Sequence, residues 1–84
     1  MFAPRPFVLE AHSTTATLYL CGRVSISTLL EALAHCECLP TDVWLLRVDA
    51  RGAEPMDAAS QAALAHGLRR WRGGRCGHTL GHAA

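Results

Sequence analysis

Apolar and polar positions predict two strands in the first quarter of the chain. Residues 7–9 form a short apolar run, and residues 15–21 are rich in β-branched and aromatic side chains. Gly22 closes the second run, as turn residues commonly do at strand ends. The polar segment 11–15 between the runs has the length of a hairpin loop. The pattern predicts a β-hairpin.

The next periodic segment predicts an amphipathic helix. Ser25 or Ser27 is placed to cap its start, and Pro40 ends it firmly. Its apolar positions recur at the spacing of one buried helix face, and they are Ile26, Leu29, Leu30, Leu33 and Ala34.

A third strand and a second helix follow. The continuous apolar run 43–46 is typical of a strand covered on both faces, and we expect this strand to end at the carboxylate of Asp49. Asp57 is placed as the N-cap of the helix. The apolar stripe of this helix consists of Ala63, Leu64, Leu68 and Trp71.

Glycines shape the end of the chain. Gly67 lets the second helix approach a neighbouring element closely, and we expect Gly73 with Gly74 to end that helix. A weak strand over residues 76–80 follows. The order β-β-α-β-α-β predicts an α/β fold with the helices packed on one face of a sheet.

Composition supports one small domain over residues 1–84, with flexible ends at 1–6 and 81–84. The chain is 50 % hydrophobic and 18 % charged, which is typical of a globular fold and not of a disordered chain. The net charge of +1 gives no reason to expect a nucleic-acid partner. We interpret the cluster Arg69, Arg70, Arg72 and Arg75 as a solvated last turn, where the helix dipole favours cations.

Sequence signals for export and membrane insertion are lacking. No apolar run approaches the roughly 20 residues that cross a bilayer, and the N-terminus lacks the pattern of a secretory signal. We therefore expect a cytoplasmic protein whose four cysteines are reduced thiols.

The sequence offers little for catalysis and one open metal alternative. A Ser-His-Asp order, a glycine-rich phosphate loop and paired catalytic carboxylates are all missing, so we expect neither an enzyme nor a cofactor. Cys36, Cys38, Cys76 and His78 supply four soft ligands, as many as zinc needs. Their Cys-x-Cys and Cys-x-His spacing is looser than a strong zinc signature. Cys36 is more simply a small core residue.

The succession of these segments resembles the STAS domain, the fold of anti-sigma-factor antagonists and of related modules in transporters and stress-signalling complexes. Residues 20–25 stand where the family ends a strand in a Gly-Glu/Arg-Leu-Asp phrase, and residues 46–53 match its Asp-Leu-Ser-Gly strand. Residues 57–60 match its Asp-Ser-Ser-Gly helix start, and residues 71–75 match its Gly-Gly before an edge strand.

The resemblance implies a module that binds another protein without making or breaking bonds. The implied partner is an anti-sigma-factor switch kinase, or alternatively the ATPase of an ABC lipid-transport complex. From the residues alone, Asp57 is mainly a helix cap and Asp49 pairs with Arg51 or a backbone amide. The implied partner-binding residues are Asp49, Arg51, Gly52, Asp57, Ala58, Ala59 and Ser60.

The chain departs from the family pattern in three ways, one of which is that Ala59 and Ser60 stand where the family has Ser and Gly. Ala58 stands at the position of the phosphorylated Ser or Thr, so binding would not be gated by phosphate there. The family's last helix-strand-helix is missing, which would leave a sheet face uncovered and an edge strand unpaired. A partner chain or homo-oligomerisation is the physical remedy.

Overall fold

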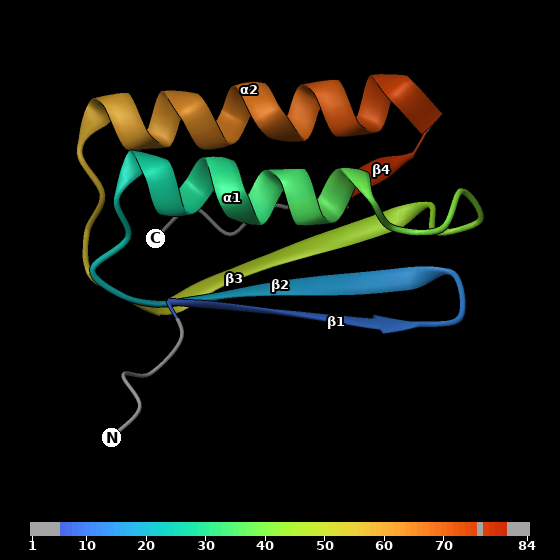
Figure 1. Cartoon of the computed structure of the whole chain (residues 1–84), viewed down its shortest axis with the longest axis horizontal. Helices are drawn as coiled ribbons and strands as arrows, with labels where there is room; N and C mark the ends of the chain where they lie inside the picture. Colours follow the sequence, from blue (N-terminus) through green and yellow to red (C-terminus); the bar gives the residue numbers. More distant parts are fainter. Residues whose placement is uncertain (1–5, 76, 81–84) are drawn as a thin grey trace.

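The computed structural model describes residues 6–75 and 77–80, and within them the predicted order of elements is confirmed. Figure 1 shows these elements. They are β1 (Phe7–His12), β2 (Thr15–Gly22), α1 (Ile26–Glu37), β3 (Leu45–Ala53), α2 (Ala58–Arg75) and β4 (His78–Leu80). Neither described helix is long and apolar enough to cross a membrane. The ends that we expect to be flexible, 1–6 and 81–84, lie outside the described residues except for Pro6.

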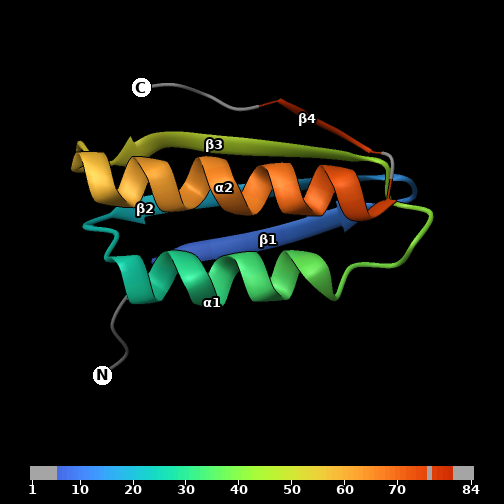
Figure 2. The same cartoon turned by 90° about the horizontal axis from the view of Figure 1, so that it is seen from above.

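The described strands form one mixed sheet in the order β1-β2-β3-β4. β1 is antiparallel to β2, whereas β2, β3 and β4 run parallel. Both helices lie side by side on one face, with α1 nearer β1 and α2 nearer β3 (Figure 2). The prediction of an α/β sheet with helices on one face is confirmed.

The β1–β2 hairpin is tighter than the sequence predicts. His12 pairs with Thr15, so Ser13 and Thr14 alone form the turn instead of a loop over residues 11–15. Ser13 has φ of 56°, in the left-handed region that two-residue hairpin turns favour. The loop prediction was wrong because it treated polar side chains as loop, although on a bare sheet face polar residues continue a strand.

The core lies between the sheet and the helices. Along β3, residues 46, 48 and 50 are buried, whereas Arg47 is exposed between them. The prediction of a strand covered on both faces was therefore wrong. The apolar run that suggested it straddles the strand start, because Val43 is buried in the preceding loop and Trp44 is 46 % exposed.

Helix α1 buries only part of the predicted face, because Leu29 and Leu33 are buried as predicted whereas Ile26, Leu30 and Ala34 are not. Its buried residues are Leu29, Ala32, Leu33 and Cys36. Ile26 and Leu30 are 42 % and 57 % exposed, and Ala34 is also exposed. The helix carries two apolar stripes that share Leu29 and Leu33. The prediction from the helical spacing chose the stripe with the larger side chains. Close packing against the sheet and α2 selects the stripe that contains Ala32 and Cys36.

Helix α2 passes through Gly73 and Gly74 and ends at Arg75, contrary to the expectation that these glycines end it. A glycine ends a helix most readily when it takes a positive φ. Among the described glycines Gly22 has a positive φ, of 66°, and neither Gly73 nor Gly74 does. The additional turn carries Arg75 to the loop that follows α1.

Gly67 allows a close approach, as predicted, and the neighbouring element is α1. A Cβ at this position would lie 2.8 Å from Cδ2 of the buried Leu33 and 3.0 Å from its Cγ. Gly73 lies in the same helix, and a Cβ there would meet nothing within 4 Å. The two glycines therefore share a helix but differ in available space.

We expect Gly67→Ala and Gly73→Ala to change stability in opposite directions. Gly67→Ala should lower the free energy of unfolding by about 1–2 kcal/mol, because overpacking outweighs the gain in helix propensity. Gly73→Ala should raise it by roughly 0.5–1 kcal/mol. Urea unfolding followed by far-UV circular dichroism measures both. A stabilising Gly67→Ala would contradict the close helix contact.

Candidate functional site

The carboxyl ends of β2 and β3 meet at one edge of the sheet because the two strands are parallel. The Glu54 N–H donates to the Gly22 carbonyl oxygen at 2.8 Å and joins the loop that follows β3 to the end of β2. Helices α1 and α2 both begin just beyond these strand ends (Figure 1). In α/β sheets, the edge at the carboxyl ends of the strands is the usual place for a binding site.

Asp57 caps α2, which confirms its predicted structural role. Its Oδ1 accepts the Ser60 backbone N–H at 2.7 Å, and its backbone oxygen accepts the Gln61 N–H at 3.0 Å. The side chain of Gln61 also donates to the Met56 carbonyl oxygen at 2.7 Å. These bonds fix the chain where the loop enters the helix. Ser25 caps α1 in the same way, accepting the Thr28 N–H at 3.2 Å.

The hydrogen bonds from Ser60, first from its backbone N–H and then from its side chain, lower the pKa of Asp57 below its ordinary value of 3.8. The folded state therefore binds a proton on Asp57 less readily than the unfolded state does. The stability that the charged cap contributes is present above pH 3.8 and is lost as the pH falls through the lower folded pKa.

We expect the stability difference between the wild type and Asp57→Asn to depend on pH in that direction. Asparagine keeps a capping oxygen but not the charge. The wild type should be the more stable protein at pH 6, and the difference should shrink as the pH falls below about 4. Urea unfolding of both proteins from pH 3 to pH 7 measures it. A difference that is the same at every pH would contradict a charged cap.

Asp49 lies within β3 and not at its end, because the strand continues to Ala53. The predicted strand end was therefore wrong, whereas the predicted pairing with Arg51 is confirmed. Oδ1 of Asp49 accepts the backbone N–H and the Nε–H of Arg51, both at 3.1 Å, and Oδ2 accepts Nη2 at 2.9 Å. The carboxylate raises the pKa of Arg51 above its ordinary value.

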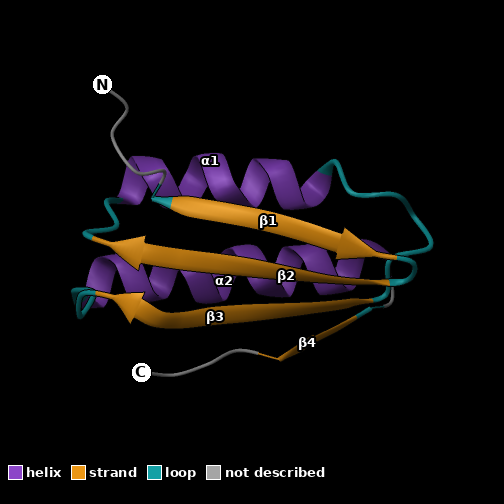
Figure 3. Cartoon of the chain, turned by 90° about the horizontal axis from the view of Figure 1, so that it is seen from below, coloured by secondary structure: helices purple, strands orange, loops and turns teal. Residues whose placement is uncertain are grey.

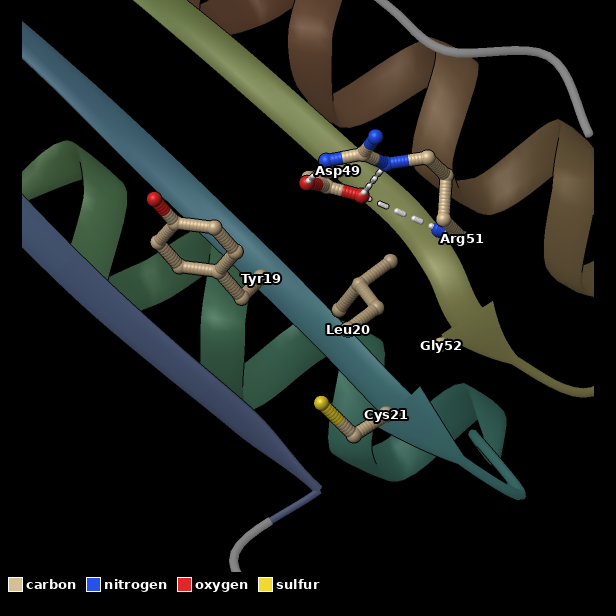
Figure 4. Close-up of a pocket in the computed structure, with 6 residues that line it drawn as sticks. All are labelled: Tyr19, Leu20, Cys21, Asp49, Arg51 and Gly52. Carbon is tan, nitrogen blue, oxygen red and sulfur yellow. Dashed lines mark hydrogen bonds and ion pairs between the residues drawn. The ribbon is translucent and has the colours of Figure 1, made fainter.

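A β-bulge in β3 lies beside this ion pair. Tyr19 pairs with Asp49 and Cys21 pairs with Gly52, so β3 contains one more residue than β2 over this stretch. Bulges often re-aim side chains near binding sites. A shallow depression of about 410 Å³ lies here (Figure 4), lined by Tyr19, Leu20, Cys21, Asp49, Arg51 and Gly52.

The structure divides the predicted site into two parts. Asp49 and Arg51 lie on the face of the sheet opposite the helices (Figure 4). Asp57, Ala58 and Ala59 are exposed at the start of α2, on the layer of the helices. Ser60 is only 4 % exposed, so its hydroxyl is not offered to solvent. Gly52 is exposed near the end of β3, between the two parts.

The cysteine and histidine residues of the zinc alternative do not come together in the part of the chain that the structure describes. Cys36 is 0 % exposed in the core, and burial raises the pKa of its thiol to about 11, although Arg75 opposes the shift. Cys38 is exposed after α1, and His78 packs edge-on against Trp44. No three metal-ligating side chains gather among the described residues. Cys76 lies outside them.

Arg75 has a structural role that the sequence interpretation missed. Its Nη1 donates to the carbonyl oxygens of Pro40 at 2.7 Å and Val43 at 3.3 Å. Its Nη2 donates to Leu39 at 3.2 Å and Glu37 at 3.4 Å. The Glu37 carbonyl group is at the end of α1, where it has no partner within the helix, and the other three belong to the loop that follows. Hydrophobic periodicity carries no signal for an arginine that binds the loop after a different helix.

Comparisons with known proteins support the fold and no narrower assignment. No family model and no curated protein matches the chain. A solved structure described as "Crystal Structure Analysis of Mglu" is similar, with a TM-score of 0.79 and 16 % sequence identity. The similarity covers 92 % of this chain but 19 % of the other, so the chain spans about a fifth of that protein's length. What the similarity shows is the small α/β fold.

Proposed function

We propose that this chain is a non-catalytic protein-binding module of the STAS type. The contact would be the helix-start surface, defined as the exposed residues Glu54, Pro55, Asp57, Ala58 and Ala59. The observation that carries the proposal is the rigid presentation of this surface. The Glu54–Gly22 hydrogen bond and the Asp57 cap hold its backbone, and all five of its residues are exposed.

The partner that the resemblance favours is an anti-sigma-factor switch kinase. Two observations support binding that is not gated by phosphate at this surface. Ala58 has no hydroxyl group, and the hydroxyl of Ser60 lies in a side chain that is 4 % exposed. A preformed surface with no group to modify would bind whenever the partner is present. The alternative partner from the resemblance is the ATPase of an ABC lipid-transport complex.

The test is capture of a partner from native lysate by wild-type protein and by surface variants. Ala58→Arg adds a bulky charge to the helix-start surface without removing the Asp57 cap, and should reduce recovery of the partner about tenfold or more. Glu31→Arg is the matched control, because Glu31 is exposed on α1 away from this surface. We expect its recovery to equal that of the wild type.

The identity of the captured protein then decides between the two partner classes. Mass spectrometry should identify a kinase, and an ATPase of a lipid transporter would favour the alternative. Incubation with the captured kinase and ATP should add no phosphate to the chain. Equal capture by Ala58→Arg and the wild type would overturn the assignment of the surface, and no specific capture at all would overturn the proposed function.

A further inference from the structure

Within residues 6–75 and 77–80, both helices lie on one face of the sheet and no element covers the opposite face, the bare face, although most of the strand pairing is parallel. Strands β2, β3 and β4 pair in parallel, and parallel sheets are usually covered on both faces. Figure 3 views the sheet from this bare face, with both helices behind it. We propose that the bare face binds a second copy of the chain and forms a weak dimer with two-fold symmetry.

The central strand of the bare face meets the first requirement for such symmetry. Residues on or near a two-fold axis meet their own copies, so like charges there would repel. The buried residues of β2 are Ala16, Leu18 and Leu20, and the alternate residues therefore point to the bare face. None of these alternate residues is Asp, Glu, Lys or Arg; they are Thr15, Thr17, Tyr19 and Cys21.

The flanking strands meet the second requirement, which is charge complementarity. Glu10 on β1 and Arg47 on β3 both pair in register with Thr17 and are both exposed. They lie two strand spacings apart, about 10 Å. Among the described residues neither side chain forms a hydrogen bond or ion pair. A rotation of 180° about an axis along β2 places Glu10 of each copy opposite Arg47 of the other.

The rest of the bare face is compatible with this contact. Val8 is 44 % exposed on β1, and Trp44, which is 46 % exposed in the loop before β3, packs edge-on against His78. Large exposed apolar side chains are common anchors of protein interfaces. Asp49 and Arg51 already neutralise each other within one chain, so contact would bury no isolated charge at that position.

The size of the bare face sets the expected affinity. The axes of β1 and β3 are about 10 Å apart, and a strand of eight residues is about 26 Å long. This area is small beside the roughly 800 Å² that each partner buries in a standard interface. We therefore expect a dissociation constant in the micromolar range, with association weakened by salt because the charge pairs are exposed.

Sedimentation velocity of the 84-residue chain tests the proposal, at about 5 to 300 μM and in low and high salt. The wild type should pass from monomer to dimer over this range. Glu10→Arg and Arg47→Glu should each weaken association about tenfold or more, because each places like charges opposite one another. The double variant exchanges the two charges and should restore the dimer. Glu31→Arg on α1 is the control that should dimerise like the wild type.

Two outcomes would overturn the proposal. One is a wild-type protein that stays monomeric at the highest concentration. This result does not depend on whether any variant folds. The other is a double variant that dimerises no better than the single variants, which would place the contact elsewhere. Circular dichroism of each variant verifies folding. The helix-start surface is not involved, so Ala58→Arg should leave this self-association unchanged.

Discussion

Trp71→Ala is expected to lower the free energy of unfolding by about 3–5 kcal/mol, more than any other single truncation in the helix layer. The indole is 2 % exposed, and its Nε1–H donates to the Cys36 carbonyl oxygen at 3.0 Å in the core. Truncation would leave a cavity and remove the indole hydrogen bond to that carbonyl group, which would keep its other hydrogen bond, from the Leu39 N–H at 3.1 Å. It would also remove the ring over which the Arg75 guanidinium lies at 4.7 Å.

This loss is large for so small a domain. Stabilities of about 0.05–0.15 kcal/mol per residue give a domain of this length a total of roughly 4–13 kcal/mol. Trp71→Ala should therefore be partly or wholly unfolded at 37 °C. Trp44→Ala is the matched control, because that indole is 46 % exposed, and it should cost less than about 1 kcal/mol. Urea unfolding measures both, and equal losses would contradict the burial of Trp71.

The fold was predictable because its elements carry local signals. Strand and helix patterns alternate along the chain, and the N-cap residues Ser25 and Asp57 mark where the helices begin. Gly67 marks the close approach of the helices. Element ends were harder to predict, because they depend on tertiary contacts. Helix α2 continues past Gly73 and Gly74, and its last residue, Arg75, contacts the loop after α1.

The candidate site was predictable only in part, for a related reason. The sequence places Asp49 and Asp57 eight positions apart, and a short loop between them would bring both to one surface. The bulge and the longer β3 instead place Asp49 on the bare face of the sheet and Asp57 at the start of α2. Neither strand length nor a bulge follows from the hydrophobic pattern, because both are set by the register with β2.

Arg75→Met is expected to lower the free energy of unfolding by roughly 2–3 kcal/mol, the second large effect. Methionine keeps much of the apolar stem but removes the hydrogen bonds to four backbone carbonyl groups. It also removes the cation–π contact with Trp71. Arg72→Met is the matched control in the same turn, because Arg72 is exposed, and its effect should be within about 0.5 kcal/mol.

Two further variants show whether Arg75 acts through its geometry or only through its charge. Arg75→Lys keeps the charge but replaces the planar fork with a single ammonium group. It should recover less than half of the stability lost in Arg75→Met, since one ammonium group cannot reproduce two nitrogen atoms that donate to four carbonyl groups. A double-mutant cycle with Trp71→Phe should give a coupling energy of about 0.5–2 kcal/mol. If Arg75→Lys recovered all of the lost stability and the coupling energy with Trp71 were zero, Arg75 would act only by neutralising the end of α1. The contacts of Arg75 would then not explain why α2 continues past Gly73 and Gly74.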